Sequence, residues 1–168
     1  MTIFSVNTQR HDPYKTYRFL VYFGTTTTPV AAVSKVTTLK RVSDVIEYKE
    51  GGFNIIHKGL GRTKYDPITL ERGVTQDTGF IDWADATQKL DQGLPTTSLA
   101  NLRREIRIQL LNEMGQPVHG YIVHRCWVSE FQALPDLDAG ANAIALEHIK
   151  LENEGWEVDP TIVEVPET

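Results

Sequence analysis

The sequence predicts an all-β sandwich or barrel, mostly antiparallel, with one α-helix packed against it. Three observations support this fold class. Several short runs are rich in aromatic and β-branched residues or alternate apolar with polar positions, and Gly, Pro and Asn separate them. Only one segment has a convincing helical period. Two alternating runs flank the turn sequence NEMGQP and predict a hairpin. Together they predict six or seven strands and one helix.

The first strands lie in the N-terminal third of the chain. Residues 17–23, YRFLVYF, predict a strand that ends at Gly24 and at a threonine run closed by Pro29. Residues 30–48 contain many Val, Thr and Ile residues and are compatible with one long or bent strand. The break comes at Gly51 and Gly52. A further short strand, ITLERGVT, follows Pro67.

The segment between these strands is predicted to be a loop of about 16 residues, from Lys49 to Lys64. Its glycines and basic residues are too polar for a helix and too irregular for a strand. Loops of that length without structure of their own are uncommon in compact domains and are often functional. The loop is therefore the first candidate for a functional segment.

The single helix is predicted after residue 78. Asp77 or Thr78 is expected to cap its start, and Gly93, Leu94 and Pro95 to end it. Apolar and small residues recur at steps of three and four, at Phe80, Trp83, Ala84, Thr87 and Leu90.

The C-terminal half is dominated by the predicted hairpin, residues 103–111 and 118–131. A polar loop, DLDAGAN, follows it. The pattern of residues 143–158 is compatible with either a strand or a helix. The acidic tail, residues 159–168, contains proline and is expected to be mobile.

Length and composition indicate one globular domain over residues 1–168, with its core at about residues 12–158. Cys126 is the only cysteine, which excludes an intrachain disulfide and a cysteine zinc cage. Neither a signal peptide nor a membrane anchor is expected, so cytoplasmic synthesis is the default. A formal net charge of −5 is unfavourable for a surface that binds nucleic acid.

No motif predicts a catalytic site. His124, Arg125 and Cys126 are adjacent, but alternation in a strand would place His124 and Cys126 on one side and Arg125 on the other. A small buried cysteine is the preferred interpretation.

No motif predicts a metal or cofactor site either. Asp136, Asp138 and Glu147 faintly resemble a calcium loop, but Ala141 occupies the position that requires glycine. The five histidines are scattered, and Gly59-Leu60-Gly61 lacks the lysine and hydroxyl of a phosphate loop.

Five long motifs in a fixed order carry a family resemblance. The chain resembles the tail tube protein family of contractile phage tails and phage-tail-like injection systems, which is related to the Hcp protein of type VI secretion. The similarity extends from about Asp12 to Val158. The motifs are DPYKTYRFLV at 12–21, VIEYKEGG at 45–52, GRTKYDPITLERGVT at 61–75, RCWVSEFQALPDLDA at 125–139 and AIALEHIKLENEGWEV at 143–158.

The resemblance implies two packed sheets forming a small barrel or sandwich with a helix on the outside, and it assigns residues 143–158 to a strand. It also implies hexameric rings stacked into a hollow tube, assembled from chains made in the bacterial cytoplasm. The implied partners are the sheath, baseplate, spike and tape-measure proteins, and DNA or effector proteins as cargo. The alternatives are a ring-forming adaptor at the baseplate or tube end, a stand-alone binding domain, and an undetected enzyme.

The resemblance also implies that the segment Lys49–Lys64 reaches neighbouring subunits. Its glycines would allow close backbone approach, and its basic residues would meet carboxylates of an acidic neighbour. The alternative is a solvated loop without a partner. The expected interface residues are Lys49, Gly51, Gly52, Lys58, Gly59, Gly61, Arg62 and Lys64.

Overall fold

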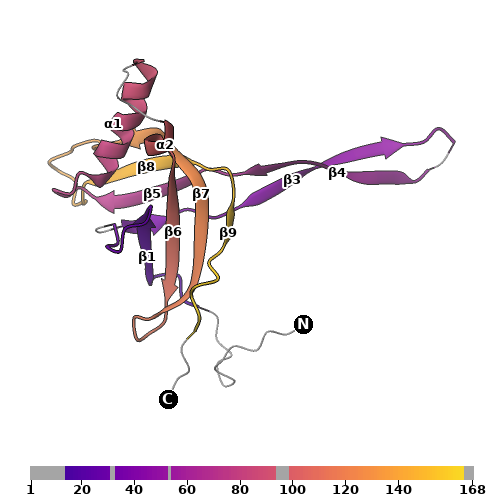
Figure 1. Cartoon of the computed structure of the whole chain (residues 1–168). Coiled ribbons are helices and arrows are strands. Elements are labelled where there is room, and N and C mark those ends of the chain that lie inside the picture. The colour runs from indigo at the N-terminus through magenta and orange to yellow at the C-terminus, as the bar shows by residue number, and fades with distance from the viewer. Residues whose placement is uncertain (1–13, 31–32, 53, 94–98, 165–168) are drawn as a thin grey trace.

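The computed structural model describes residues 14–30, 33–52, 54–93 and 99–164. A body of two packed sheets carries a helix at one end, and a long hairpin projects from it (Figure 1). The elements in chain order are β1 (Phe19–Phe23), β2 (Val33–Val36), β3 (Arg41–Lys49), β4 (Ile56–Tyr65), β5 (Ile68–Gly73), α1 (Gly79–Asp91), α2 (Leu99–Leu102), β6 (Arg104–Leu111), β7 (Pro117–Gln132), β8 (Leu146–Glu152) and β9 (Trp156–Val158).

The body is one antiparallel sheet folded onto itself. Its strand order is β1-β6-β7-β8-β5-β2, with β9 beside β7, while β3 and β4 pair only with each other. The 16-residue strand β7 belongs to both layers, because its first part pairs with β6 and β9 and its second part with β8. The predicted mainly β fold with antiparallel sheets and an outer helix is confirmed, as a small sandwich and not a closed barrel.

The sheet turns its corner at a bulge in β7. Arg125 has a φ of 53°, and the pairing with β6 shifts by one residue at this point. Val123 and Cys126 therefore both face the core. The predicted placement of His124 and Cys126 on one side is wrong, because the bulge breaks the alternation. His124 instead lies at the surface, with its ring nitrogens 3.2 Å from carboxylate oxygens of Glu105 and Glu157.

The core lies between the two layers and under α1. Phe80 and Trp83 of α1 are fully buried, and the Trp83 ring meets the Phe23 ring edge-on at 5.0 Å. The Trp83 indole N–H donates to the Leu102 carbonyl at 2.8 Å. The strands contribute mainly branched aliphatic side chains to this core, namely Val21, Ile68, Leu70, Ile106, Val123, Ile149 and Leu151. These are the inward positions of the alternating runs.

A buried arginine joins the sheet to the start of α1. The Arg72 guanidinium on β5 donates to Glu147 Oε1 at 2.5 Å, to Asp77 Oδ2 at 2.9 Å and to the Asp77 carbonyl at 2.6 Å. It also lies 4.0 Å from the centre of the Phe80 ring. Asp77 in turn accepts the Gly79 N–H at 2.9 Å, so Asp77, one of the two predicted caps, holds the helix start.

Two predictions about residues 30–64 are wrong. Residues 30–48 do not form one strand, because β2 pairs with β5 in the body while β3 belongs to the hairpin. The predicted loop Lys49–Lys64 is also wrong, because residues 56–65 form β4 and only the turn between β3 and β4 is irregular. One of the glycines that suggested a loop serves strand pairing, since a Cβ on Gly61 would stand 2.7 Å from the Asp44 carbonyl oxygen.

We expect Gly61→Ala to loosen the hairpin without affecting the body. The Asp44 backbone would have to move to admit the methyl group, so amide hydrogen exchange should accelerate across β3 and β4. Gly59→Ala is the matched control, because its Cβ would lie 3.7 Å from the nearest atom. Equal exchange rates in the two variants would show that Gly61 is not a constrained position.

The two ends of the described chain meet beside the body. Asp159 is buried, its N–H donates to the Gly120 carbonyl at 2.8 Å, and its carboxylate accepts the Thr161 N–H at 2.9 Å. Tyr14 then donates to Glu164 at 3.2 Å. The predicted mobile tail, residues 159–168, therefore begins with a packed segment; residues 165–168 lie outside the described part, as do residues 12–13 of the predicted core. None of the helices within the described ranges is long and apolar enough to cross a bilayer.

Candidate functional site

The most unusual feature of the molecule is the hairpin of β3 and β4, residues 41–65, called the arm below. It extends well beyond the body (Figure 1). Every residue of β3 is exposed, and so is β4 except at Gly61 and Tyr65. A two-stranded hairpin without a covering layer is marginally stable in water. Both faces of the arm are therefore uncovered in the single chain.

All eight predicted interface residues lie on the arm. Lys49 ends β3, Gly51 and Gly52 form the turn at the tip, and Gly52 has a φ of 100° that favours glycine. The other five, Lys58, Gly59, Gly61, Arg62 and Lys64, belong to β4. The structure brings these residues onto one projecting element.

The arm is basic, although the chain is acidic. It contains five basic and three acidic residues, which leaves a formal charge of −7 on the rest of the chain. Lys58 lies 3.9 Å from Glu47 and Lys64 lies 3.1 Å from Asp44, so these two cations already have partners within the arm. Lys49 and Arg62 form no ion pair within the part of the chain that the structure describes. The fifth cation, Arg41, lies 6.0 Å from the centre of the Trp156 ring, so Lys49 and Arg62 are the arm's cations without a described partner.

Exposed apolar side chains are the part of the arm that sequence reasoning missed. Leu60 is 82% exposed and faces Val45 across the hairpin. Ile46 and Tyr48 occupy the other face, where the Tyr48 ring lies 5.9 Å from that of His57. A hydrogen bond from Tyr48 to the Glu50 carboxylate raises the pKa of Tyr48. The alternation from Val42 to Tyr48 was visible in the sequence, but nothing there indicated that both faces would be uncovered.

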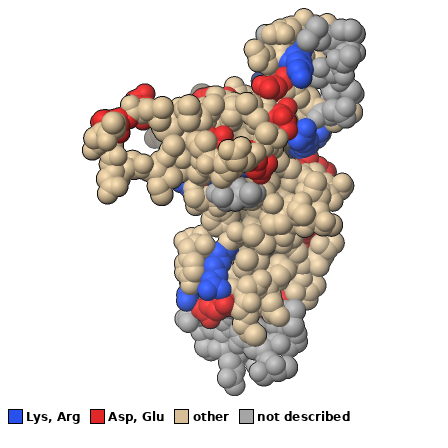
Figure 2. All heavy atoms as spheres, turned by 90° about the vertical axis from the view of Figure 1, so that its left-hand side faces the viewer, with Lys and Arg blue, Asp and Glu red and all other residues tan. Residues whose placement is uncertain are grey.

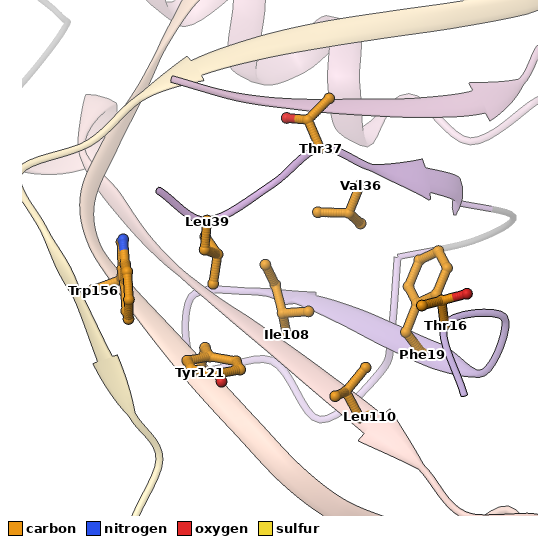
Figure 3. Close-up of a pocket in the computed structure, with 9 residues that line it drawn as sticks. All are labelled: Thr16, Phe19, Val36, Thr37, Leu39, Ile108, Leu110, Tyr121 and Trp156. Carbon is orange, nitrogen blue, oxygen red and sulfur yellow. The ribbon is translucent and has the colours of Figure 1, made fainter. Parts of the chain in front are cut away.

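The body has a second apolar opening, at the seam between the two ends of the sheet. β1 and β2 are the terminal strands of the path and do not pair with each other. A hollow of about 300 Å³ lies at this seam, and its lining includes Phe19, Leu39, Ile108, Leu110, Tyr121 and Trp156 (Figure 3). No charged residue lines it. It offers apolar packing and no group suited to acid–base or nucleophilic chemistry.

Two of the residues considered for catalysis and metal binding are buried or paired with other side chains of the fold. Cys126 is buried, and burial raises the pKa of its thiol to about 12. Glu147, considered as a calcium ligand, pairs with Arg72. Within the described ranges, no three His, Cys, Asp or Glu side chains are grouped so that they could hold a metal ion.

We expect the Cys126 thiol of the folded chain to resist alkylation at pH 8. A thiolate is the reactive form, and a pKa of about 12 leaves almost none of it at that pH. The chain unfolded in guanidinium should react completely in the same time, as followed by mass spectrometry. Rapid labelling of the folded chain would contradict the buried position of this side chain.

Comparison with known proteins places the chain in a family. The family model described as "T4-like virus tail tube protein gp19" matches residues 15–157. None of the curated protein sequences matches this chain.

Three solved structures show how far the similarity extends. A chain of the sheath-tube complex of the extracellular contractile injection system PVC, in its extended state, is 26% identical with a TM-score of 0.73, over 89% of this chain and 93% of that one. A chain of the anti-feeding prophage cap is 27% identical with a TM-score of 0.73, over the same shares of 89% and 93%. An Hcp protein is 8% identical with a TM-score of 0.51, over 85% of this chain and 93% of that one, and shares the fold alone.

The family match covers nearly the whole body and the arm, and the sheath-tube chain aligns over 89% of this chain. The chain therefore belongs to the T4-like virus tail tube protein gp19 family and is a tube subunit of a contractile injection system.

Proposed function

We propose that copies of this chain form rings, six to a ring, that stack into a hollow tube, and that the arm is a contact between copies. The main observation that supports this proposal is the uncovered arm. Its exposed apolar residues are unfavourable in water, and its basic charge is complementary to the acidic remainder of a second copy. Burying the arm between subunits would also complete a hairpin that is marginal by itself.

The role of the tube is mechanical. A sheath would surround it, a baseplate and spike would start it, a tape-measure protein would set its length, and DNA or effector proteins would pass through it. The chain would be made in the bacterial cytoplasm and assembled there. The similar chain in a sheath-tube complex supports the sheath as a partner. No step of this role requires a catalytic residue or a cofactor.

A second candidate is a ring-forming adaptor at one end of the tube. The similarity to a chain of the anti-feeding prophage cap favours it. Electron microscopy of the purified protein distinguishes the two, because a tube subunit forms stacks of many rings and an adaptor stops at one or two.

We expect Arg62→Glu to abolish assembly and to leave the fold unchanged. The substitution places a negative charge against an acidic neighbour, and like charges at an interface cost several kcal/mol. Surface changes usually alter the free energy of unfolding by less than about 0.5 kcal/mol, so the circular dichroism spectrum should match the parent. Sedimentation and electron microscopy should then show soluble protein without rings or tubes.

Lys89→Glu is the control for this experiment. It makes the same change of charge at an exposed position of α1, away from the arm. If Arg62→Glu forms tubes of normal length, the arm is not an assembly contact.

A further inference from the structure

The arm needs an acceptor surface, and one loop of the body has the matching chemistry. Residues 133–145, called the acidic loop below, connect β7 to β8. They include Asp136 and Asp138 and no basic residue. The loop has 13 residues without helix or strand, and loops of that length in compact domains are usually functional or disordered.

The acidic loop borders a small hollow that is partly open to solvent. Its volume is about 170 Å³, and residues of the loop alone line it. Leu137 is 75% exposed and Ile144 is 81% exposed at its wall. With about 30 Å³ per water molecule, the hollow has the volume of five or six waters, which suits one long side chain.

The carboxylates of the acidic loop lie at the same hollow. Asp138 shapes the turn, because its Oδ1 accepts the Gly140 N–H at 2.9 Å. Asp136 is exposed and forms no ion pair or hydrogen bond within the described residues. An apolar hollow beside an uncommitted carboxylate fits a side chain with an aliphatic stem and a cationic end, which is an arginine or a lysine.

The arm supplies such a side chain. Arg62 is exposed, has no carboxylate partner among the described residues, and sits at the bulge where Gly61 and Arg62 together oppose Asp44. Bulges redirect side chains out of the regular alternation of a strand. Leu60, two residues earlier, adds an exposed apolar contact of the kind that Leu137 and Ile144 could cover.

The positions of the arm and the acidic loop exclude contact within one chain. They project from opposite ends of the body (Figure 1), and the end away from the arm shows acidic atoms on its upper-left projection (Figure 2). Ten residues of β4 span about 33 Å, and Arg62 lies three residues before the body end of this strand at Tyr65. A neighbouring copy would therefore meet Arg62 beside the base of the arm, while Leu60 and the tip extend further along it.

We propose that the acidic loop of one copy receives the arm of the next, with Arg62 in the hollow beside Asp136. This inference rests on the proposed function, because it assigns the partner surface of the arm. A contact between opposite ends of identical molecules is head-to-tail, and such contacts generate closed rings when the rotation closes and filaments when it does not. The assembly of this chain thus follows from two complementary surfaces on each copy.

A charge swap tests the pairing. The variants are Arg62→Glu, Asp136→Lys and both changes in one chain, with circular dichroism to confirm folding. We expect each single variant to reduce the sedimenting fraction at least about tenfold, because like charges then meet at the contact. The double variant should sediment like the parent, because the attraction is restored with its direction reversed. Arg62→Glu combined with Asp85→Lys, an exposed acid on α1, should stay soluble.

The outcomes separate this inference from the proposed function. If Asp136→Lys sediments like the parent, or if the double variant stays soluble, the acidic loop is not the acceptor, although the arm remains a contact. If Arg62→Glu itself sediments like the parent, the arm is not an assembly contact, and the proposed function loses its support. The pairing is supported only if the Arg62→Glu, Asp136→Lys double variant assembles, while both single variants and the Arg62→Glu, Asp85→Lys combination stay soluble.

Discussion

Replacing Arg72 with methionine should lower the free energy of unfolding by about 3–5 kcal/mol, because the change leaves the buried Glu147 carboxylate without its cation. It also removes both hydrogen bonds that hold Asp77 at the start of α1. For a chain of this size, the melting temperature should fall by roughly 6–20 °C. Thermal unfolding followed by circular dichroism measures the change.

Two further variants make the Arg72 prediction specific. Arg103→Met removes a surface ion pair with Glu154, whose atoms are 2.7 Å apart, and should cost less than about 1 kcal/mol. Adding Glu147→Gln to Arg72→Met removes the unpaired charge and should restore part of the loss. A melting temperature for Arg72→Met within about 2 °C of the parent corresponds to a loss of only about 0.5–1 kcal/mol and would contradict the role of this arginine.

Shortening the arm should abolish assembly completely and leave the body folded. Ser43 and Thr63 are cross-strand partners whose hydroxyl oxygens lie 3.0 Å apart. Replacing residues 44–62 with Asn-Gly closes the hairpin at this pair with a favourable two-residue turn. The change removes the bulge, Leu60 and Arg62 together, while the buried core lies entirely in the body.

We expect the shortened chain to remain a monomer in analytical ultracentrifugation at concentrations where the parent forms tubes. Its melting temperature should stay close to that of the parent, because the removed residues bury little surface. Tubes built by the shortened chain would show that other surfaces suffice. Loss of the folded body would show that the arm is part of the folding unit.

The strands of the body and α1 were predictable because their periodicity reflects one buried face. β1, β5 and the β6–β7 hairpin appear where alternation or aromatic enrichment indicated them, and α1 follows its apolar spacing. The bulge at Arg125 was not predictable, because a single extra residue leaves the local composition unchanged. Arg72 was missed because its partners lie 5 and 75 positions away along the chain.

The predicted interface residues all fall on the arm, but its secondary structure was predicted wrongly. Basic and glycine residues drew attention to this segment, yet they were interpreted as a loop. β4 has no buried face and shows no regular alternation of apolar and polar residues, and Gly61 is needed for a close backbone approach that the sequence does not reveal. The acidic loop showed only a faint resemblance to a calcium loop, and nothing in the sequence related it to the arm. The structure relates the two through opposite charge and through their positions at opposite ends of the body.

The most direct test of the account is an electron cryo-microscopy map of the assembled protein. Helical reconstruction should show a hollow tube of stacked rings in which each arm leaves its own body and lies against the acidic loop of the next copy. The basic residue at position 62 should then contact the carboxylate at position 136 across every repeat. Compact monomers at all concentrations, or a tube in which the arms extend into solvent without touching a neighbour, would contradict the account.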